Sequence, residues 1–370
     1  MKFSSGYVKR SETKAFTLIE LLVAVGVTAL MVTLMLTIVV NVLGGWNRSS
    51  GSLTAGSQAR LVLDQISRDL QFAIMQRDGN GWLVASIQQN QTGTGSAGVV
   101  GSNWSPTSSK PSGTGVDPAS LTPSFVIPFP VAPSTVPVIE HYRFGQGGMW
   151  LRFFTTGPDT NSTGDLHRIS APRAVAYQIV RLPVVAGSTG EERYQLFRSE
   201  VRPGHSDPTL AARSTIEVGY NLLDSTNLYN TPSATNSGVL ISNGVDQGGE
   251  PGSIRQPDRN QVIANNVIDF GVRFWSRTGA NLTIAFPRTT TDLNFAATND
   301  ITAATAAGIP NVAFPEVAEV FIRILTEEGA LLIANLEGGL TPSTPEKWWE
   351  IALANSRVYT SRVELMTPSL

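Results

Sequence analysis

The sequence predicts an α+β protein in which one long N-terminal helix packs on an antiparallel β-sheet head. Two patterns carry this prediction. An uncharged apolar run near the N-terminus continues into an amphipathic helical pattern, and much of the later chain alternates apolar and polar residues over short stretches, as strands do. The 34 Gly and 22 Pro among 370 residues agree with many turns between short strands.

The composition excludes several classes of function. Charged residues make up 15% of the chain, too few for a coiled-coil rod or a charge-rich disordered tail. A net charge of −2 provides no basic field for neutralising phosphates, so we expect no nucleic-acid partner. The absence of cysteine excludes disulfides, thiolate catalysis and cysteine-bound metals. The three histidines lie far apart and outside any zinc-binding motif: His141, His167 and His205.

The apolar run from Leu21 to Leu43 is 23 residues long and carries no charge. As a helix it would measure about 35 Å, close to the hydrocarbon thickness of a bilayer. Residues 1–15 have a net charge of +3, whereas the remainder of the chain has a net charge of −5. The positive-inside rule therefore predicts a cytoplasmic N-terminus, with the bulk of the chain on the other side of the membrane.

Three interpretations compete for this segment. A cleaved secretory signal needs a shorter apolar region of roughly 7–15 residues, and the sequence at 41–45 is a poor cleavage site. An ordinary membrane anchor fits the length but gives no reason for Glu20, because a carboxylate next to hydrocarbon is costly unless it is paired. The third interpretation gives Glu20 a partner.

The string KAFTLIELLV at 14–23 resembles the class III signal of type IV pilins and type II secretion pseudopilins. The resemblance implies that a prepilin peptidase cuts between Ala15 and Phe16, that Phe16 becomes a methylated N-terminus, and that the helix enters a filament core. Glu20 would then pair with the N-terminal amine of a neighbouring subunit, since a buried amine and a buried carboxylate are each costly alone. The chain departs from the family pattern at Ala15, where Gly is usual.

Four regions follow from these patterns. Residues 1–15 form a cytoplasmic leader, 16–45 a transmembrane or filament-core helix, 46–78 an amphipathic extension of that helix, and 79–370 an extracytoplasmic β-rich head. The extension is predicted from an apolar stripe at helical spacing, formed by Leu63, Ile66, Leu70 and Ile74. Its other face offers i,i+4 charge pairs: Arg60–Asp64 and Asp64–Arg68.

The head contains a low-complexity segment at 88–123, which we expect to be a surface loop because it has little apolar surface to bury. Alternation predicts strands at 124–131, 137–144, 148–155, 174–182, 193–201, 261–275, 315–326 and 357–366. A short helix is expected over 345–355, after Thr344 as a helix cap. The stretch from Gln261 onward is similar in pattern to J-type pseudopilins and large minor pilins.

The chain carries no motif of a nucleophile with its base, a phosphate-binding loop or a zinc protease, so we expect no enzyme. One segment resembles the start of a calcium loop, with oxygens at alternate positions from Asp159, Asn161 and Asp165. Ser170 stands where such a loop requires Glu, so a turn between strands is the favoured interpretation. No cofactor is expected, and calcium is the one candidate metal.

These patterns predict a structural subunit, a minor pilin or pseudopilin of a type IV pilus or type II secretion filament. Its partners would be a prepilin peptidase, other pilin subunits and the bacterial inner membrane, with the head in the periplasm. The large size of the head favours a tip or initiating position, because thick heads stack poorly around a narrow helical core. The alternative is a single-pass, membrane-anchored binding module, similar to an adhesin, that does not polymerise.

Overall fold

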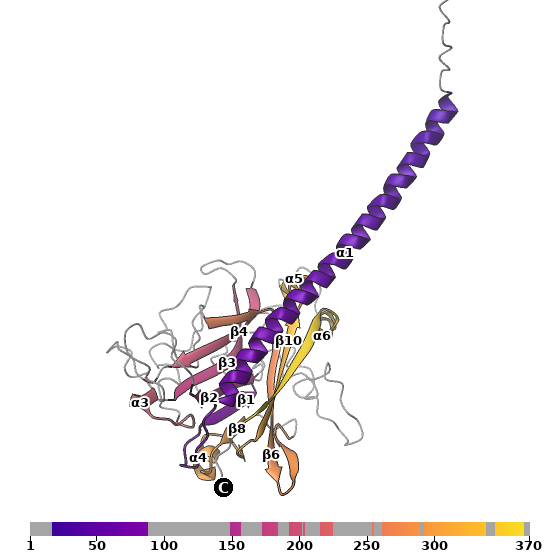
Figure 1. Cartoon of the computed structure of the whole chain (residues 1–370). Helices are drawn as coiled ribbons and strands as arrows, with labels where there is room; N and C mark the ends of the chain where they lie inside the picture. Colours follow the sequence, from indigo (N-terminus) through magenta and orange to yellow (C-terminus); the bar gives the residue numbers. More distant parts are fainter. Residues whose placement is uncertain are drawn as a thin grey trace, which may run out of the picture. The chain divides into compact units, whose positions relative to one another are not determined.

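The computed structural model describes residues 17–87, 149–156, 172–183, 192–201, 203, 215–224, 254, 261–288, 292, 294–337 and 345–365. The chain forms two compact units, residues 1–50 and 51–370. A long N-terminal helix and a strand-rich head confirm the predicted α+β class (Figure 1). The strands predicted at 124–131 and 137–144, and the loop at 88–123, lie outside the described residues.

Helix α1 (Leu18–Gln71) runs for 54 residues without interruption and so belongs to both units. It ends at Gln71, short of residue 78, where the sequence placed the end of the amphipathic extension. The reason lies in the backbone that follows. Ala73 forms an isolated antiparallel bridge with Thr155, and the Ile74 amide donates to the Phe154 carbonyl at 2.8 Å. Sheet pairing therefore takes over the backbone groups that a longer helix would use.

The head contains two sheets, whereas the sequence predicted one. The first has seven strands in the order β5-β4-β3-β2-β1-β8-β9, antiparallel except for the β8–β9 pair. The second has four antiparallel strands in the order β11-β10-β6-β7. The strands span β1 (Leu83–Ile87), β2 (Met149–Thr155), β3 (Arg173–Pro183), β4 (Glu192–Val201), β5 (Val262–Asn265), β6 (Val267–Thr278), β7 (Asn281–Phe286), β8 (Asn294–Ala297), β9 (Asn311–Val312), β10 (Val317–Leu325) and β11 (Ser356–Glu364).

The division into two sheets occurs at Asn266. This residue has a φ of 60°, a left-handed conformation that Asn tolerates better than most residues. It separates β5 from β6 within the stretch 261–275, which the sequence predicted as one strand. Because β5 pairs with β4 and β6 pairs with β10, the two pieces belong to different sheets.

Four shorter helices complete the described part of the head: α3 (Thr215–Val218), α4 (Ile301–Ala306), α5 (Glu327–Glu337) and α6 (Pro345–Ala354). Helix α6 confirms the prediction at 345–355. Helix α5 was not predicted. Its Gly329 lies against the end of α6, where an added Cβ would come within 2.5 Å of Asn355 Cβ.

The core lies between the two sheets and residues 51–71 of α1, which we call the head segment of the helix. Tyr177 of β3 and Phe270 of β6 face each other across the sheets with ring centroids 6.3 Å apart, and Phe274 stacks on Phe295 at 5.0 Å. The head segment of α1 buries residues spaced three and four apart, as the predicted stripe requires: Ala55, Ala59, Val62, Leu63, Ile66 and Leu70.

Strand β2 is buried along its whole length because both faces of the first sheet are covered. On the face away from the core, Phe154 packs edge-on against Tyr220 with centroids 5.4 Å apart. On the same face the Trp150 indole donates to the Ile254 carbonyl at 3.2 Å. A strand covered on both faces loses its simple apolar–polar alternation.

Replacing Gly329 with Ala should destabilise the head, because the new methyl group would overlap Asn355. We expect a loss of about 1–3 kcal/mol in the free energy of unfolding, the usual range for overpacking. Gly56→Ala is the matched control, since an added Cβ there would make only ordinary contacts with Tyr359, at 3.5 Å from its hydroxyl and 4.0 Å from its Cε1 atom, and would improve helix propensity. Chemical denaturation of both variants tests this; equal midpoints would contradict it.

Candidate functional site

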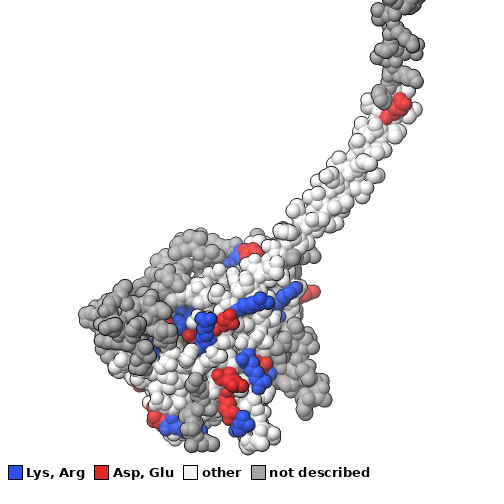
Figure 2. Space-filling model, in the orientation of Figure 1, with Lys and Arg blue, Asp and Glu red and all other residues white. Residues whose placement is uncertain are grey.

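The first half of α1 presents large apolar side chains in all directions. Between Leu18 and Leu43 these side chains are between 43% exposed, at Val39, and 76% exposed, at Leu18. Figure 2 shows this stretch almost free of charged side chains, apart from acidic atoms at the start of the helix. The helix is long and apolar enough to cross a membrane, near the N-terminus of the chain.

The charged group at the start of α1 is Glu20, which forms a capping box with Thr17. The Glu20 Oε2 atom accepts hydrogen bonds from the Thr17 amide and from the Thr17 hydroxyl, both at 2.9 Å. In return, the Glu20 amide donates to the Thr17 hydroxyl at 3.3 Å. These bonds satisfy backbone groups that a helix N-terminus leaves open. An ordinary anchor therefore has a use for Glu20, contrary to the expectation that only a neighbouring amine explains it.

Of the three sets of predicted site residues, only Glu20 lies among the described residues. Ala15 and Phe16, at the predicted cleavage point, lie outside the described residues, as do Asp159, Asn161 and Asp165 of the calcium candidate. Within the described ranges, no group of three or more His, Asp or Glu side chains is arranged to hold a metal ion.

The last turn of α1 carries a buried carboxylate, Asp69, whose side chain is only 7% exposed. Its Oδ2 atom accepts a hydrogen bond from the Tyr177 hydroxyl at 2.5 Å and another from Arg198 Nε at 2.6 Å. The Thr155 hydroxyl donates to the Asp69 carbonyl at 2.9 Å. Residues from β2, β3 and β4 thus hold the end of the helix on the first sheet.

This contact extends into an ion network of alternating charge. Arg198 Nη1 also lies 2.7 Å from Glu200 Oε2, and Glu200 Oε1 lies 2.9 Å from Arg173 Nη1. Two carboxylates and two guanidinium groups balance in charge, which is the condition under which buried ions are tolerated. We call Asp69, Tyr177, Arg198, Glu200 and Arg173 the anchor network.

The electrostatics of the anchor network favour a structural role. Burial, and then the Asp69 carboxylate, raise the pKa of the Tyr177 hydroxyl well above its ordinary value, so the phenol stays protonated and donates. Burial alone would lower the pKa of Arg198, but the hydrogen bond to Asp69 and the nearby charges outweigh it and raise that pKa. The guanidinium also offsets the unfavourable position of Asp69 at the negative end of the helix dipole.

Sequence reasoning missed the anchor network, although one signal was visible. Asp69 stands between Ile66 and Leu70 on the apolar stripe of α1, where a lone charge requires a buried partner. The charge pairs that the sequence did predict are not formed. Arg60, Asp64 and Arg68 are all exposed, and no ion pair joins them in the described part of the chain.

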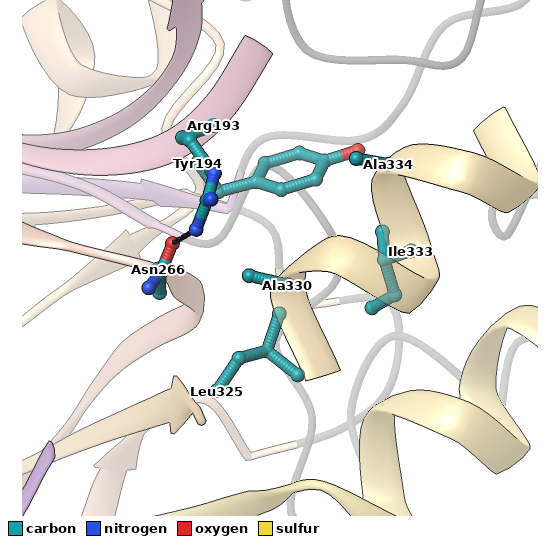
Figure 3. A pocket seen from close by; sticks show the side chains of 7 residues that line it. All are labelled: Arg193, Tyr194, Asn266, Leu325, Ala330, Ile333 and Ala334. Atoms are coloured by element: carbon teal, nitrogen blue, oxygen red, sulfur yellow. Dashed lines mark hydrogen bonds between the residues drawn. The ribbon is translucent and has the colours of Figure 1, made fainter. Parts of the chain in front are cut away.

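A second polar cluster joins α5 to the point where the sheets separate (Figure 3). Arg193 donates to Asn266 Oδ1 at 3.1 Å and to Glu327 Oε1 at 2.7 Å. Asn266 Nδ2 in turn donates to Glu327 Oε2 at 3.0 Å. The rest of the small pocket beside this cluster is lined by Tyr194, Leu325, Ala330, Ile333 and Ala334. This lining contains no nucleophile–base pair, and the cluster serves to attach the helix.

Comparison of the chain with protein-family models, with curated proteins and with solved structures finds no match.

The anchor network predicts a large difference between two Asp→Asn changes on the same helix. Asp69→Asn removes the more deeply buried of the two carboxylates that pair with Arg198, and we expect a loss of up to about 3–5 kcal/mol in the free energy of unfolding. Asp64→Asn changes an exposed, unpaired charge and should stay within about 0.5 kcal/mol of the unmodified chain. Denaturant unfolding measures both; similar losses for the two variants would show that the network does not hold the helix.

The α5 attachment should weaken in acid. The hydrogen bond from Arg193 lowers the pKa of Glu327 below its ordinary value of 4.5, with Asn266 adding to the effect. A carboxylate with a lowered folded-state pKa stabilises the fold above its unfolded pKa, and this stabilisation is lost as the pH falls through the lower folded value. Because the Glu327 side chain is 63% exposed, we expect at most about 1 kcal/mol.

Melting temperatures of the unmodified chain and of Glu327→Gln, measured between pH 7 and pH 3, test this prediction. The two chains should differ at pH 6 and converge as the pH falls below about 4.5. If the difference in melting temperature between the two chains did not change with pH, the effect of the substitution would come from packing and not from the charge of Glu327.

Proposed function

We propose that this protein is a structural subunit, a minor pilin or pseudopilin, of a bacterial type IV pilus or type II secretion filament. It would be cut by a prepilin peptidase between Ala15 and Phe16, methylated on Phe16, and assembled through α1. This proposal rests on two features that occur together in one helix. The string KAFTLIELLV opens an apolar segment that exposes its side chains on every side and then continues, unbroken, into the head.

The threonine hydroxyls of the apolar segment support this proposal, because they are hydrogen-bonded within the helix. The hydroxyls of Thr28, Thr33 and Thr37 each donate to the carbonyl four residues earlier, at 2.8–2.9 Å. The outer surface therefore presents apolar groups both to lipid before assembly and to neighbouring helices afterwards.

The anchor network supports the proposal from the other end of the helix. A filament subunit must transmit load from its helix to its head, and a helix held only by apolar contacts could slide along the sheet. Directional bonds from Asp69 to Tyr177 and Arg198 fix one axial position. On this account the subunit resides in the inner membrane before assembly, with residues 1–15 in the cytoplasm, the head in the periplasm, and other pilin subunits as partners.

The Thr17–Glu20 capping box favours a second candidate, a membrane-anchored binding module that does not polymerise. In that case Glu20 serves only to begin the helix. The two candidates differ in whether the negative charge of Glu20 is needed.

Glu20→Gln separates them, because Gln retains the acceptor of the capping box and removes the charge. If the chain is a filament subunit, this variant should insert into the membrane as before but enter sheared filaments at less than about a tenth of the normal level, since its partner amine loses its counter-charge. Thr17→Ala is the matched control: it weakens the cap by about 1 kcal/mol and leaves the charge in place.

The measurement is the ratio of filament to membrane protein by quantitative blotting. Normal incorporation of Glu20→Gln, or an equal loss in both variants, would contradict the filament role of Glu20. Absence of the unmodified chain from sheared filaments would favour the anchor.

A further inference from the structure

The head segment of α1 has an outer face that does not pack on the head. Leu53 and Leu61 lie on it, two helical turns apart, with 73% and 65% of their surface exposed. Arg60 and Arg68 are exposed beside them, with Asp64 between. Figure 2 shows positive and negative side chains close together on the face of the head that the view presents. We call Leu53, Arg60, Leu61, Asp64 and Arg68 the α1 outer face; its net charge is +1.

Helix α5 has a second such face of opposite charge. Its buried side chains are Ala330, Ile333 and Leu336, whereas Leu331 and Leu332 remain 44% and 42% exposed on the opposite side. The first turn of α5 contains two acidic residues, Glu327 and Glu328, and its last turn contains no basic one. Glu327 is held by Arg193. Glu328 is exposed and forms no ion pair within the described residues. We call Glu328, Leu331 and Leu332 the α5 outer face.

We propose that the α1 outer face of one copy docks on the α5 outer face of the next, which is an inference that rests on the proposed filament function. Paired leucines on each side supply apolar contact, and Glu328 supplies the carboxylate partner that Arg60 and Arg68 do not have among the described residues of their own chain. The α1 outer face has a net positive charge and the α5 outer face carries only negative charge, so each face attracts the other more strongly than a copy of itself, and the contact is heterologous. A heterologous contact that does not close into a ring produces an open helical array.

Because the natural chain has no cysteine, single introduced thiols report the contact without background. Full-length chains carrying Leu61→Cys and Leu332→Cys would be co-expressed and oxidised in their native membranes with copper phenanthroline. We expect a disulfide-linked dimer only when both variants are present. A chain with both changes should form a ladder of oligomers. Ile216→Cys with Ile301→Cys is the matched control, since these side chains are 58% and 63% exposed and lie on neither face; it should stay monomeric.

Charge reversal tests the electrostatic part of the contact. Glu328→Arg should reduce the Leu61→Cys/Leu332→Cys cross-link by at least about fivefold, because it places like charges together. Adding Arg60→Glu and Arg68→Glu to the same chain should restore it. Arg77→Glu with Arg277→Glu makes the same change in net charge outside both faces and should not restore it.

Ile38→Cys, in the exposed apolar half of α1, separates failure of this contact from failure of the proposed function. If Ile38→Cys cross-links copies and the Leu61→Cys/Leu332→Cys pair does not, the chain assembles and the docking proposal is wrong. If neither cross-links, both proposals fail. Self-dimers of either single variant would also overturn the heterologous contact.

Discussion

The rest of the structure depends on the apolar surface that the first half of α1 presents to its surroundings. Each Å² of such surface costs roughly 25 cal/mol when it faces water, and the exposed side chains from Leu18 to Leu43 are large ones. A bilayer would cover them and so, in the filament that we propose, would a sheath of similar helices. The capping box at Thr17 and the internally bonded threonine hydroxyls agree with this constraint, because each removes a polar group that lipid would leave unsatisfied.

The second half of the same helix packs on the head with one of its faces. It must attach to a folded head while keeping one face free, and small residues allow close approach: Ala55 and Ala59 are buried, and Gly56 lies beside Tyr359. Apolar contact of this kind has little axial specificity. The bonds from Tyr177 and Arg198 to Asp69 provide that specificity, and they occur at the last turn, where α1 gives way to sheet.

Sequence patterns predicted the elements whose periodicity is strong. The apolar run and its stripe predicted α1, and alternation predicted β3, β4, β10 and β11 within a few residues. Helix α5 was missed because it follows a strand directly and contains Gly329, a poor helix former retained for its close approach to Asn355. The second sheet was missed because its separation from the first depends on the backbone of one residue, Asn266. The three-residue spacing of Thr17 and Glu20 is typical of a capping box. It was not predicted as one, because the resemblance to pilins explains Glu20 by charge pairing.

The intact mass and N-terminal sequence of the protein purified from its native membrane test the proposed function most directly. A chain that begins at N-methylated Phe16 is the predicted result, because it requires recognition of the leader by a prepilin peptidase and leaves Glu20 as the fifth residue. A chain that still begins at Met1 would contradict the account. The apolar helix would then be a permanent anchor, and the function of the protein would have to lie in the head alone.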